Sequence, residues 1–504
     1  MRFKIDRSAR WEGPTVHLVG IIVFGISVSL AVPVSAAVLL GEDPLPFAAP
    51  MAFCLCASLL MMSLFRMHDG PMKAVDGLIM IGCAWLAAVA IGVIPYIMFG
   101  MPPADAIFES ASGFTTTGST IMSDIESWPR SLLLWRSMTQ WVGGIATILI
   151  FLFLMPMLGF GGRTFFNNEL SGSGSRNFTA RMADAAKHFA IIYGALSVVL
   201  LVTLVVLGVD IYESLCMMFS TVSTGGFMCT NDSLAGYGGL VQSIVILFML
   251  LGGTNFYLHY KAIYKRDPRS YFRSSEFVMM VLWFLLASAI IFVLLGAGGL
   301  EQYKDVLFTV VSLGTSTGFA TVDYSLWAGA AIAVILAVML VGGSSGSTAG
   351  GIKVGRLLIV HKYILNGLNA LIHPRAIYDV KVDGDTVEKD YVSSAVIVFM
   401  LFLGTIMVSG IVLAALGMGI QDAFVSAITA ICNVGPALGP YGPYGSFAEL
   451  DDVSKVFMGF IMWVGRLEIA TALVMLTPGF WKEYVMGHNT RASRLRKVFF
   501  GKRF

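Results

Sequence analysis

Ten apolar segments, each long enough to cross a lipid bilayer, constrain this 504-residue chain more than any other feature. A membrane-crossing helix needs about 20 mostly apolar residues, and the chain is 57% hydrophobic and only 13% charged. Soluble domains carry about 25% charge, so we predict an all-α polytopic membrane protein with ten spanning helices. The predicted spans are residues 15–40, 45–65, 74–99, 131–158, 188–208, 240–260, 276–298, 326–365, 391–417 and 453–481.

The first of these segments, from Thr15 to Leu40, resembles a signal peptide because it ends in small residues. It is longer than the about 7–15 residues of a signal-peptide core, and Asp6 and Glu12 dilute the positive charge before it. We therefore expect a retained spanning helix. The six cysteines and seven histidines lack the spacing of a disulfide framework or a metal site, so no cofactor is predicted.

A short motif that ends in glycine recurs four times between the spans. The copies read Phe-Thr-Thr-Thr-Gly, Thr-Val-Ser-Thr-Gly, Gly-Thr-Ser-Thr-Gly and Ile-Cys-Asn-Val-Gly, and their glycines are Gly118, Gly225, Gly318 and Gly435, at intervals of 107, 93 and 117 residues. A period near 100 residues with so little side-chain identity indicates a divergent four-fold repeat. Four copies around one axis predict a pseudo-four-fold pore flanked by two extra N-terminal helices.

Each motif follows an apolar segment that is too short to span the membrane. These segments would be about 16 Å long as helices, at about 1.5 Å per residue, so we expect half-helices that enter and leave on the same side. An extended strand after each could point its carbonyl oxygens at a cation. Asp105, Asp305 and Asp422 fall where they would cap the half-helices. The segments are 105–115, 212–222, 305–315 and 422–432.

Positive charge gathers in alternate loops, as the positive-inside rule requires. With a cytoplasmic N-terminus, the inside segments include Lys261 to Arg273, Lys353 to Lys389 and the tail from Arg491 to Arg503. The outside segments keep Arg130, Lys304 and Lys455 as their only basic residues. This asymmetry predicts a multi-pass protein with both termini in the cytoplasm and all four half-helices on the outer face.

The spans and repeats divide the chain into six predicted regions. No loop is long enough for a soluble catalytic domain, and no strand–helix unit carries Gly-x-Gly-x-x-Gly, so we predict no enzyme activity. The regions are a two-helix extension (1–67), pore repeat 1 (68–165), pore repeat 2 (180–268), pore repeat 3 (270–367), pore repeat 4 (388–490) and a basic tail (491–504).

A glycine-rich run at 342–351 interrupts the eighth apolar segment. Five glycines in ten residues will not hold a straight helix. One interpretation is an irregular intramembrane loop that gates the pore. The other is close helix packing, because glycine recurs at every fourth position from Gly342 to Gly350. The candidate gate residues are Gly342, Gly343, Gly346, Gly350, Gly351, Lys353 and Arg466.

Arg466 and Arg136 lie deep inside apolar segments. A charged residue there costs at least about 2.5–3.5 kcal/mol and usually faces a partner or a wet cavity. Arg466 could be an electrostatic barrier below a cation filter. It could instead be structural, either paired with Glu109, Glu213 or Glu468 or hydrogen-bonded to carbonyls freed by the broken helix. For Arg136 the structural interpretation is favoured.

Together, these features resemble the Trk/Ktr/HKT superfamily of potassium transporters and, within it, the bacterial Trk membrane subunit. The resemblance covers nearly the whole chain and includes the run Gly-Ser-Thr-Ala-Gly-Gly-Ile-Lys at 346–353 and Gly-Arg-Leu-Glu at 465–468. It implies a bacterial inner-membrane protein that conducts K⁺ and Rb⁺, with K⁺ as the transported ion. In plant relatives, serine at the first filter glycine accompanies sodium transport, so Gly118 implies a preference for potassium.

The resemblance also implies the ion ligands and the partners. A homodimer in the lipid bilayer and a separate cytoplasmic nucleotide-binding regulatory ring are expected, and the loop at 342–351 is expected to gate. The implied K⁺ ligands are the backbone carbonyls of Thr115, Thr116, Thr117, Gly118, Ser223, Thr224, Gly225, Ser316, Thr317, Gly318, Asn433, Val434 and Gly435.

Two other functions compete with a potassium pore. Gly343-Ser-Ser-Gly346 matches an intramembrane serine protease with Ser345 as nucleophile, but no histidine lies mid-span to act as its base. A sodium-permeable or ion-coupled symporter of the same fold would also use broken helices. Half-helices that all enter from one side favour the pore.

Overall fold

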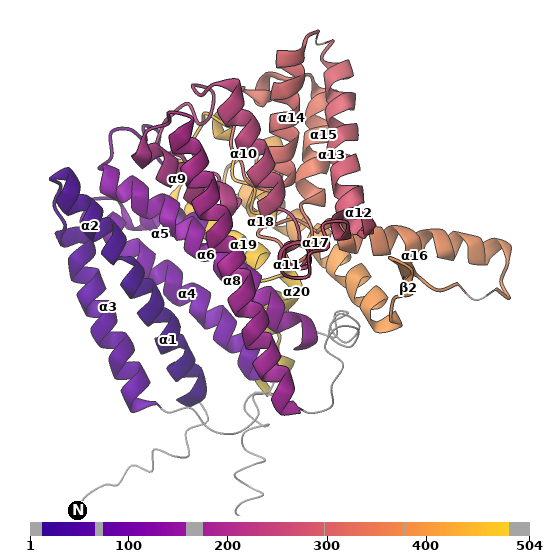
Figure 1. Ribbon diagram of the computed structural model, residues 1–504, viewed down its shortest axis with the longest axis horizontal. Coiled ribbons are helices and arrows are strands. Elements are labelled where there is room, and N and C mark those ends of the chain that lie inside the picture. Colours follow the sequence, from indigo (N-terminus) through magenta and orange to yellow (C-terminus); the bar gives the residue numbers. More distant parts are fainter. Residues whose placement is uncertain (1–12, 66–73, 158–174, 297, 377, 483–504) are drawn as a thin grey trace, which may run out of the picture. The chain divides into compact units, whose positions relative to one another are not determined.

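The computed structural model describes residues 13–65, 74–157, 175–296, 298–376 and 378–482 (Figure 1). The predicted basic tail 491–504 lies outside these residues. Within them the chain is mostly helical, with one two-stranded antiparallel hairpin, β1 (Lys381–Val382) and β2 (Asp385–Thr386), in which Lys381 is opposite Thr386. The prediction of an all-α membrane protein is confirmed.

The described residues form two compact units, one from those within 1–99 and 467–482 and one from those within 100–466. In the first unit, α1 contacts both α3 and α4, and α20 contacts α4. Large apolar side chains such as Leu39 and Phe53 are 86% and 71% exposed. A surface of this kind suits lipid rather than water. The helices of this unit are α1 (Gly13–Ser29), α2 (Ala31–Leu40), α3 (Leu45–Leu64), α4 (Ala74–Met98) and α20 (Ile469–Met475).

The second unit contains the four predicted half-helices, α5 (Pro103–Phe114), α9 (Ile211–Val222), α14 (Leu300–Gly314) and α18 (Ile420–Cys432). Its other helices are α6 (Arg130–Met157), α8 (Ser175–Val206), α10 (Gly239–Gly252), α11 (Phe256–Tyr264), α12 (Ser270–Arg273), α13 (Ser275–Leu294), α15 (Gly329–Val341), α16 (Val354–Ile372), α17 (Lys389–Ala415) and α19 (Asp452–Arg466), with short 3₁₀ turns at Tyr324–Leu326 and Gly439–Tyr441. Figure 1 shows α13, α14 and α15 side by side, as one flanking helix, half-helix and second flanking helix.

The four half-helices are linked through the helices that follow them. Each half-helix contacts the next helix of its own repeat, and that helix also contacts the half-helix of the next repeat. Thus α6 contacts α9, α10 contacts α14, α15 contacts α18, and α19 returns to α5. The second unit is therefore a closed cycle of four repeats. The finer boundaries given above for the pore repeats stay a prediction.

The spans differ from ten straight helices. By length and hydropathy, six helices of the described chain could cross a membrane, and up to eight if two broken pairs each count as one. The segment 240–260 is not straight, because α10 and α11 meet at 97°. The segment 326–365 is interrupted between Val341 and Val354, and 453–481 is interrupted after Arg466. In each case the break falls at the end of a glycine-containing run, where helix propensity is low.

The predicted caps are wrong. Asp105, Asp305 and Asp422 all lie inside their helices rather than at the N-cap. Asp105 instead pairs with the Lys455 ammonium at 2.6 Å. Only α9, among the four half-helices, has a side-chain cap: Asp210 accepts hydrogen bonds from the N–H groups of Tyr212 and Glu213. The count back of 13 residues from each glycine missed Asp210 because it ends inside the half-helix, at Tyr212 in α9, rather than at the N-cap.

Candidate functional site

A backbone conformation that ordinary residues rarely adopt recurs once after each half-helix. After each half-helix, one non-glycine residue has φ between 51° and 54°, and a glycine two positions later has φ between 82° and 108°. Such left-handed backbone favours glycine and is adopted by other residues only where the surroundings hold it. The pairs are Thr116 and Gly118, Thr224 and Gly226, Ser316 and Gly318, and Asn433 and Gly435.

This pattern corrects the alignment of the second repeat by one residue. The residue before each left-handed glycine donates its N–H to a carbonyl five residues earlier: Thr117 to Ser112 at 2.9 Å, Thr317 to Ser312 at 2.7 Å, and Val434 to Thr429 at 2.9 Å. In the second repeat the corresponding bond runs from Gly225 to Ser220 at 2.8 Å. Gly226, not Gly225, is therefore the structural counterpart of Gly118.

The four glycines form a ring with four carbonyl oxygens. A Cβ added to Gly118 would lie 2.2 Å from the carbonyl oxygen of Gly225, and one added to Gly226 would lie 1.9 Å from that of Thr317. The cycle continues from Gly318 to Val434 at 2.2 Å and closes from Gly435 to Thr117 at 2.7 Å. Real Cβ atoms essentially never approach within 3.0 Å. Glycine is thus required for the four segments that follow the half-helices, called strands from here on, to come this close.

Hydroxyl groups on the half-helices hold the strands that follow them. Ser112 donates to the carbonyl of Ser119 at 2.6 Å, and Ser312 donates to that of Phe319 at 2.7 Å. Thr429 makes the equivalent bond to Pro436 at 3.1 Å. These hydroxyl groups satisfy carbonyls at the C-terminal ends of three of the four strands.

The glycine-rich run at 342–351 is an irregular loop, which excludes the helix-packing interpretation, since α15 ends at Val341 and α16 begins at Val354. The loop contacts three of the four strands. Each contact is at the non-glycine residue with left-handed φ or at the residue just before it. Thr224 donates to the Thr348 hydroxyl at 3.1 Å, and the Gly350 N–H donates to the Ser316 hydroxyl at 2.7 Å. A Cβ on Gly350 would lie 2.0 Å from the Cys432 carbonyl. The loop is therefore fitted closely against the ends of the strands that adjoin the half-helices.

Two charged side chains hold this loop. The Glu276 carboxylate, at the start of α13, accepts the N–H groups of Ser345 at 2.6 Å and Gly355 at 3.0 Å. Arg466, at the end of α19, donates from Nη1 to the Thr348 carbonyl at 2.9 Å. Of the predicted gate residues, Arg466 therefore contacts the loop directly, from the fourth repeat. Lys353 lies at its far end, with φ of 77° and its ammonium 4.9 Å from the Phe151 ring.

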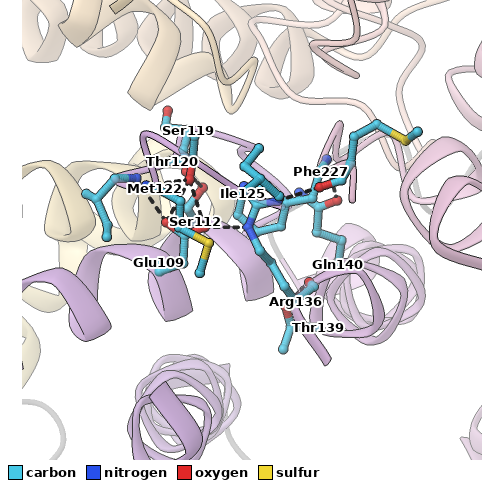
Figure 2. A network of polar contacts seen from close by, with 12 residues as sticks. Glu109, Ser112, Ser119, Thr120, Met122, Ile125, Arg136, Thr139, Gln140 and Phe227 are labelled. Carbon is cyan, nitrogen blue, oxygen red and sulfur yellow. Dashed lines mark hydrogen bonds and ion pairs between the residues drawn. The ribbon is translucent and has the colours of Figure 1, made fainter. Parts of the chain in front are cut away.

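Arg136 forms the buried structural pair that the sequence favoured. Its Nε donates to the Glu109 carboxylate, and its Nη1 donates to the Met228 carbonyl at 2.9 Å (Figure 2). Its guanidinium also lies 3.6 Å from the centre of the Phe227 ring. Glu109 accepts further bonds from the Thr120 hydroxyl and the Ile121 N–H. The pair joins the first half-helix to the strands of repeats 1 and 2.

A second internal motif, which the sequence analysis missed, marks the helices that line the strands. Four pentapeptides align, and their first residues are Gln140, Met249, Met339 and Met462: Gln-Trp-Val-Gly-Gly, Met-Leu-Leu-Gly-Gly, Met-Leu-Val-Gly-Gly and Met-Trp-Val-Gly-Arg. In three of them, a Cβ on the fourth residue would lie within 2.9 Å of a carbonyl of the half-helix in its own repeat. Arg466 thus stands where the other three repeats have glycine.

A cyclic arrangement of four strands inside a polytopic helical protein defines the class of membrane-embedded pore proteins. The profile of a family described as cation transport protein, TrkH, matches residues 46–300 and 299–479. The match covers most of the chain, and the chain belongs to the TrkH family of cation transport proteins.

Individual relatives agree over almost the full length. The chain is 32% identical to the Trk system potassium uptake protein TrkH of Escherichia coli K12, covering 83% of this chain and 88% of the relative. It is 30% identical to TrkH of Vibrio parahaemolyticus, covering 93% and 99%. The crystal structure of the potassium transporter TrkH from Vibrio parahaemolyticus superposes with a TM-score of 0.86 at 28% identity, covering 94% of this chain and all of that one.

Proposed function

We propose that this protein is a potassium-uptake pore whose selectivity filter is the ring of four strands. The observation that carries the proposal is the cycle of glycines and carbonyl oxygens that closes through all four repeats. Carbonyl oxygens crowded in this way can replace the water shell of a cation. The half-helices end at the strands, and their C-terminal ends, equivalent to roughly −0.5 charge each, favour a cation there.

The proposed ligands are the backbone carbonyls of the residues predicted from the sequence, with Gly226 added by the corrected alignment. K⁺ is the cargo, and the relatives named as potassium uptake proteins support this choice. The membrane potential supplies about 2.3 kcal/mol per charge per 100 mV, which drives uptake without a coupled ion. A sodium-permeable or ion-coupled symporter is the alternative. Glycine at all four positions of the ring, Gly118, Gly226, Gly318 and Gly435, favours a narrow potassium filter over this alternative.

The loop at 342–351 is the proposed gate, since it lies against the ends of three strands that adjoin the half-helices and is held by Glu276 and Arg466. An inner-membrane location with cytoplasmic termini, a homodimer and a cytoplasmic nucleotide-binding ring belong to the same proposal. A loop fastened by a few hydrogen bonds is a suitable element for a partner to release, because a bond between neutral groups contributes only about 0.5–1.5 kcal/mol and a bond to a charged group about 1.5–3 kcal/mol.

Reconstituted protein is expected to pass Rb⁺ and K⁺ in preference to Na⁺, and Gly118→Ser is expected to erode that preference. The serine Cβ would enter the space of the Gly225 carbonyl. The measurement is ⁸⁶Rb⁺ and ²²Na⁺ flux into liposomes with and without a regulatory ring. Absence of any alkali-cation flux in both conditions contradicts the proposal, and equal Rb⁺ and Na⁺ flux in the unaltered protein favours the alternative.

Replacement of Arg466 by alanine is expected to raise Rb⁺ flux severalfold in the absence of a regulator. The substitution removes both a positive charge below the filter and the bond to the Thr348 carbonyl. Flux per molecule of reconstituted protein, with expression measured separately, is the readout. Lower expression with unchanged flux per molecule would show that Arg466 is only structural. The exposed Arg273, whose side chain is 70% exposed, provides the control by Arg273→Ala.

A further inference from the structure

The second strand lacks a side chain where the other three strands have one. Thr117, Thr317 and Val434 precede the left-handed glycines of repeats 1, 3 and 4, whereas Gly225 precedes Gly226. Gly225 has no left-handed φ, so its backbone alone does not require glycine. The reason lies in its surroundings. A Cβ on Gly225 would lie 2.4 Å from Cδ and 2.5 Å from Oε1 of Gln140.

Gln140 fills this space and makes two hydrogen bonds to the strand. Its Nε2 donates to the Gly225 carbonyl at 2.6 Å, and its Oε1 accepts the Phe227 N–H at 3.0 Å. The side chain is fully buried on α6, one turn after Arg136, and it approaches the strand next to Phe227 (Figure 2). Because a backbone N–H can only donate, the Phe227 bond fixes which end of the amide faces the Gly225 carbonyl.

The repeats themselves supply the comparison. Gln140 occupies the first position of the pentapeptide motif, and the corresponding residues are Met249, Met339 and Met462, all fully buried. Each of these helices contacts the half-helix of the following repeat. The single polar residue at this position therefore faces the single strand that has glycine instead of threonine or valine. Glutamine on the preceding helix thus accompanies glycine in the strand, and methionine on the preceding helix accompanies threonine or valine. The four repeats of one chain provide this comparison.

We propose that Gln140 is a positioning residue for ion selectivity, which replaces the missing side chain of the second strand and fixes the Gly225 carbonyl in the filter ring. The Gly225 carbonyl oxygen packs against Gly118 of the preceding strand, just as the other three ring carbonyl oxygens each pack against the glycine of the strand before them. Gln140 thus fixes the Gly225 carbonyl by a hydrogen bond from α6, while the carbonyl stays part of the ring. The inference rests on the proposed function, because it assigns a role within the same filter.

Three variants test this inference in the full-length reconstituted protein. Gln140→Met removes both bonds to the strand, and Gly225→Thr places a side chain in the space of Gln140. Each is expected to lower the Rb⁺/Na⁺ flux ratio about tenfold, the equivalent of a lost buried hydrogen bond. The double variant, Gln140→Met with Gly225→Thr, copies the pairing of Met249 with Thr317. It is expected to recover most of the ratio.

Controls separate positioning from folding. Gln140→Glu keeps the shape and can still accept the Phe227 N–H, but its ionised form cannot donate to the Gly225 carbonyl. Because burial favours the protonated form, this variant is expected to lose selectivity when the assay pH is raised far enough to ionise the carboxyl. Gln242 is another buried glutamine, and it donates to the Leu234 carbonyl at 2.9 Å, outside the ring. Gln242→Met is expected to lower the unfolding temperature and leave the flux ratio unchanged.

The outcomes distinguish this inference from the proposed function. If the unaltered protein shows no preference for Rb⁺, the proposed function fails. If the unaltered protein is selective but Gln140→Met and, at the raised pH, Gln140→Glu keep its ratio, or if the double variant is no more selective than the single ones, the role of Gln140 is overturned. Loss of selectivity in Gln242→Met to the same degree would also overturn it, because any buried glutamine would then suffice.

Discussion

Replacement of Gly226 by alanine is expected to abolish selective cation uptake. The alanine Cβ would lie 1.9 Å from the Thr317 carbonyl oxygen, with φ of 82°. The left-handed backbone costs about 1–2 kcal/mol for an alanine, and forcing an atom into a filled site costs typically about 1–3 kcal/mol. Together these correspond to a loss of about a hundredfold in the population of intact filter. Rb⁺ and Na⁺ flux into liposomes measures the effect.

Gly208 provides a matched control for Gly226. It lies just before α9, has φ of 87°, and has no atom within 4 Å of a Cβ added to it. Gly208→Ala thus carries the same backbone strain without the collision. It is expected to lower stability slightly and to keep the Rb⁺/Na⁺ ratio. If Gly226→Ala is as active and selective as Gly208→Ala, the ring of glycines and carbonyls is not the filter.

Replacement of Arg136 by methionine is expected to be the most destabilising change outside the filter. It leaves the Glu109 carboxylate buried without its cation and also removes the bond to the Met228 carbonyl. Breaking one partner of a buried ion pair costs about 3–5 kcal/mol. The measurement is the unfolding temperature of the purified protein in detergent. Adding Glu109→Gln to Arg136→Met is expected to recover part of the loss, since no buried charge then remains uncompensated.

The exposed pair of Arg273 and Asp267 is the control for this prediction. Their side chains are 70% and 40% exposed and their charged atoms lie 3.5 Å apart. Exposed pairs contribute about 0–1 kcal/mol, so Arg273→Ala is expected to leave the unfolding temperature nearly unchanged. An Arg136→Met protein that unfolds at the same temperature as Arg273→Ala would show that the buried pair contributes little.

Much of this fold could be predicted from hydropathy and spacing. The four half-helices lie within a few residues of their predicted positions, and the loop at 342–351 is irregular as its glycines indicated. The bends at α10–α11 and after Arg466 could not be predicted in the same way. A bend at 97° in an apolar run leaves no trace in average hydropathy. Its place is marked by the pair Gly252-Gly253 at α10–α11, whereas the break after Arg466 follows a single glycine, Gly465.

The site was harder to predict than the fold because the motif letters are ambiguous in repeat 2. Ser223-Thr224-Gly225 matches Ser316-Thr317-Gly318 letter for letter, yet the adjacent Gly226 is the residue in the left-handed conformation. Only the backbone hydrogen bond of Gly225 to Ser220 decides between them. Gln140 was missed because one polar residue in an apolar helix has many explanations. The aligned pentapeptides, read as a repeat, would have revealed it.

The closed cycle of strands has a mechanical consequence. The glycine of each strand packs against a carbonyl oxygen of the next strand, and the glycine of the fourth strand packs against a carbonyl oxygen of the first. A single strand therefore cannot move toward or away from the axis without its neighbours. The diameter of the ring is then set by all four strands together and not by any one of them. A change in any one repeat has to be absorbed by all four, which explains how repeats with such different side chains can keep one common geometry.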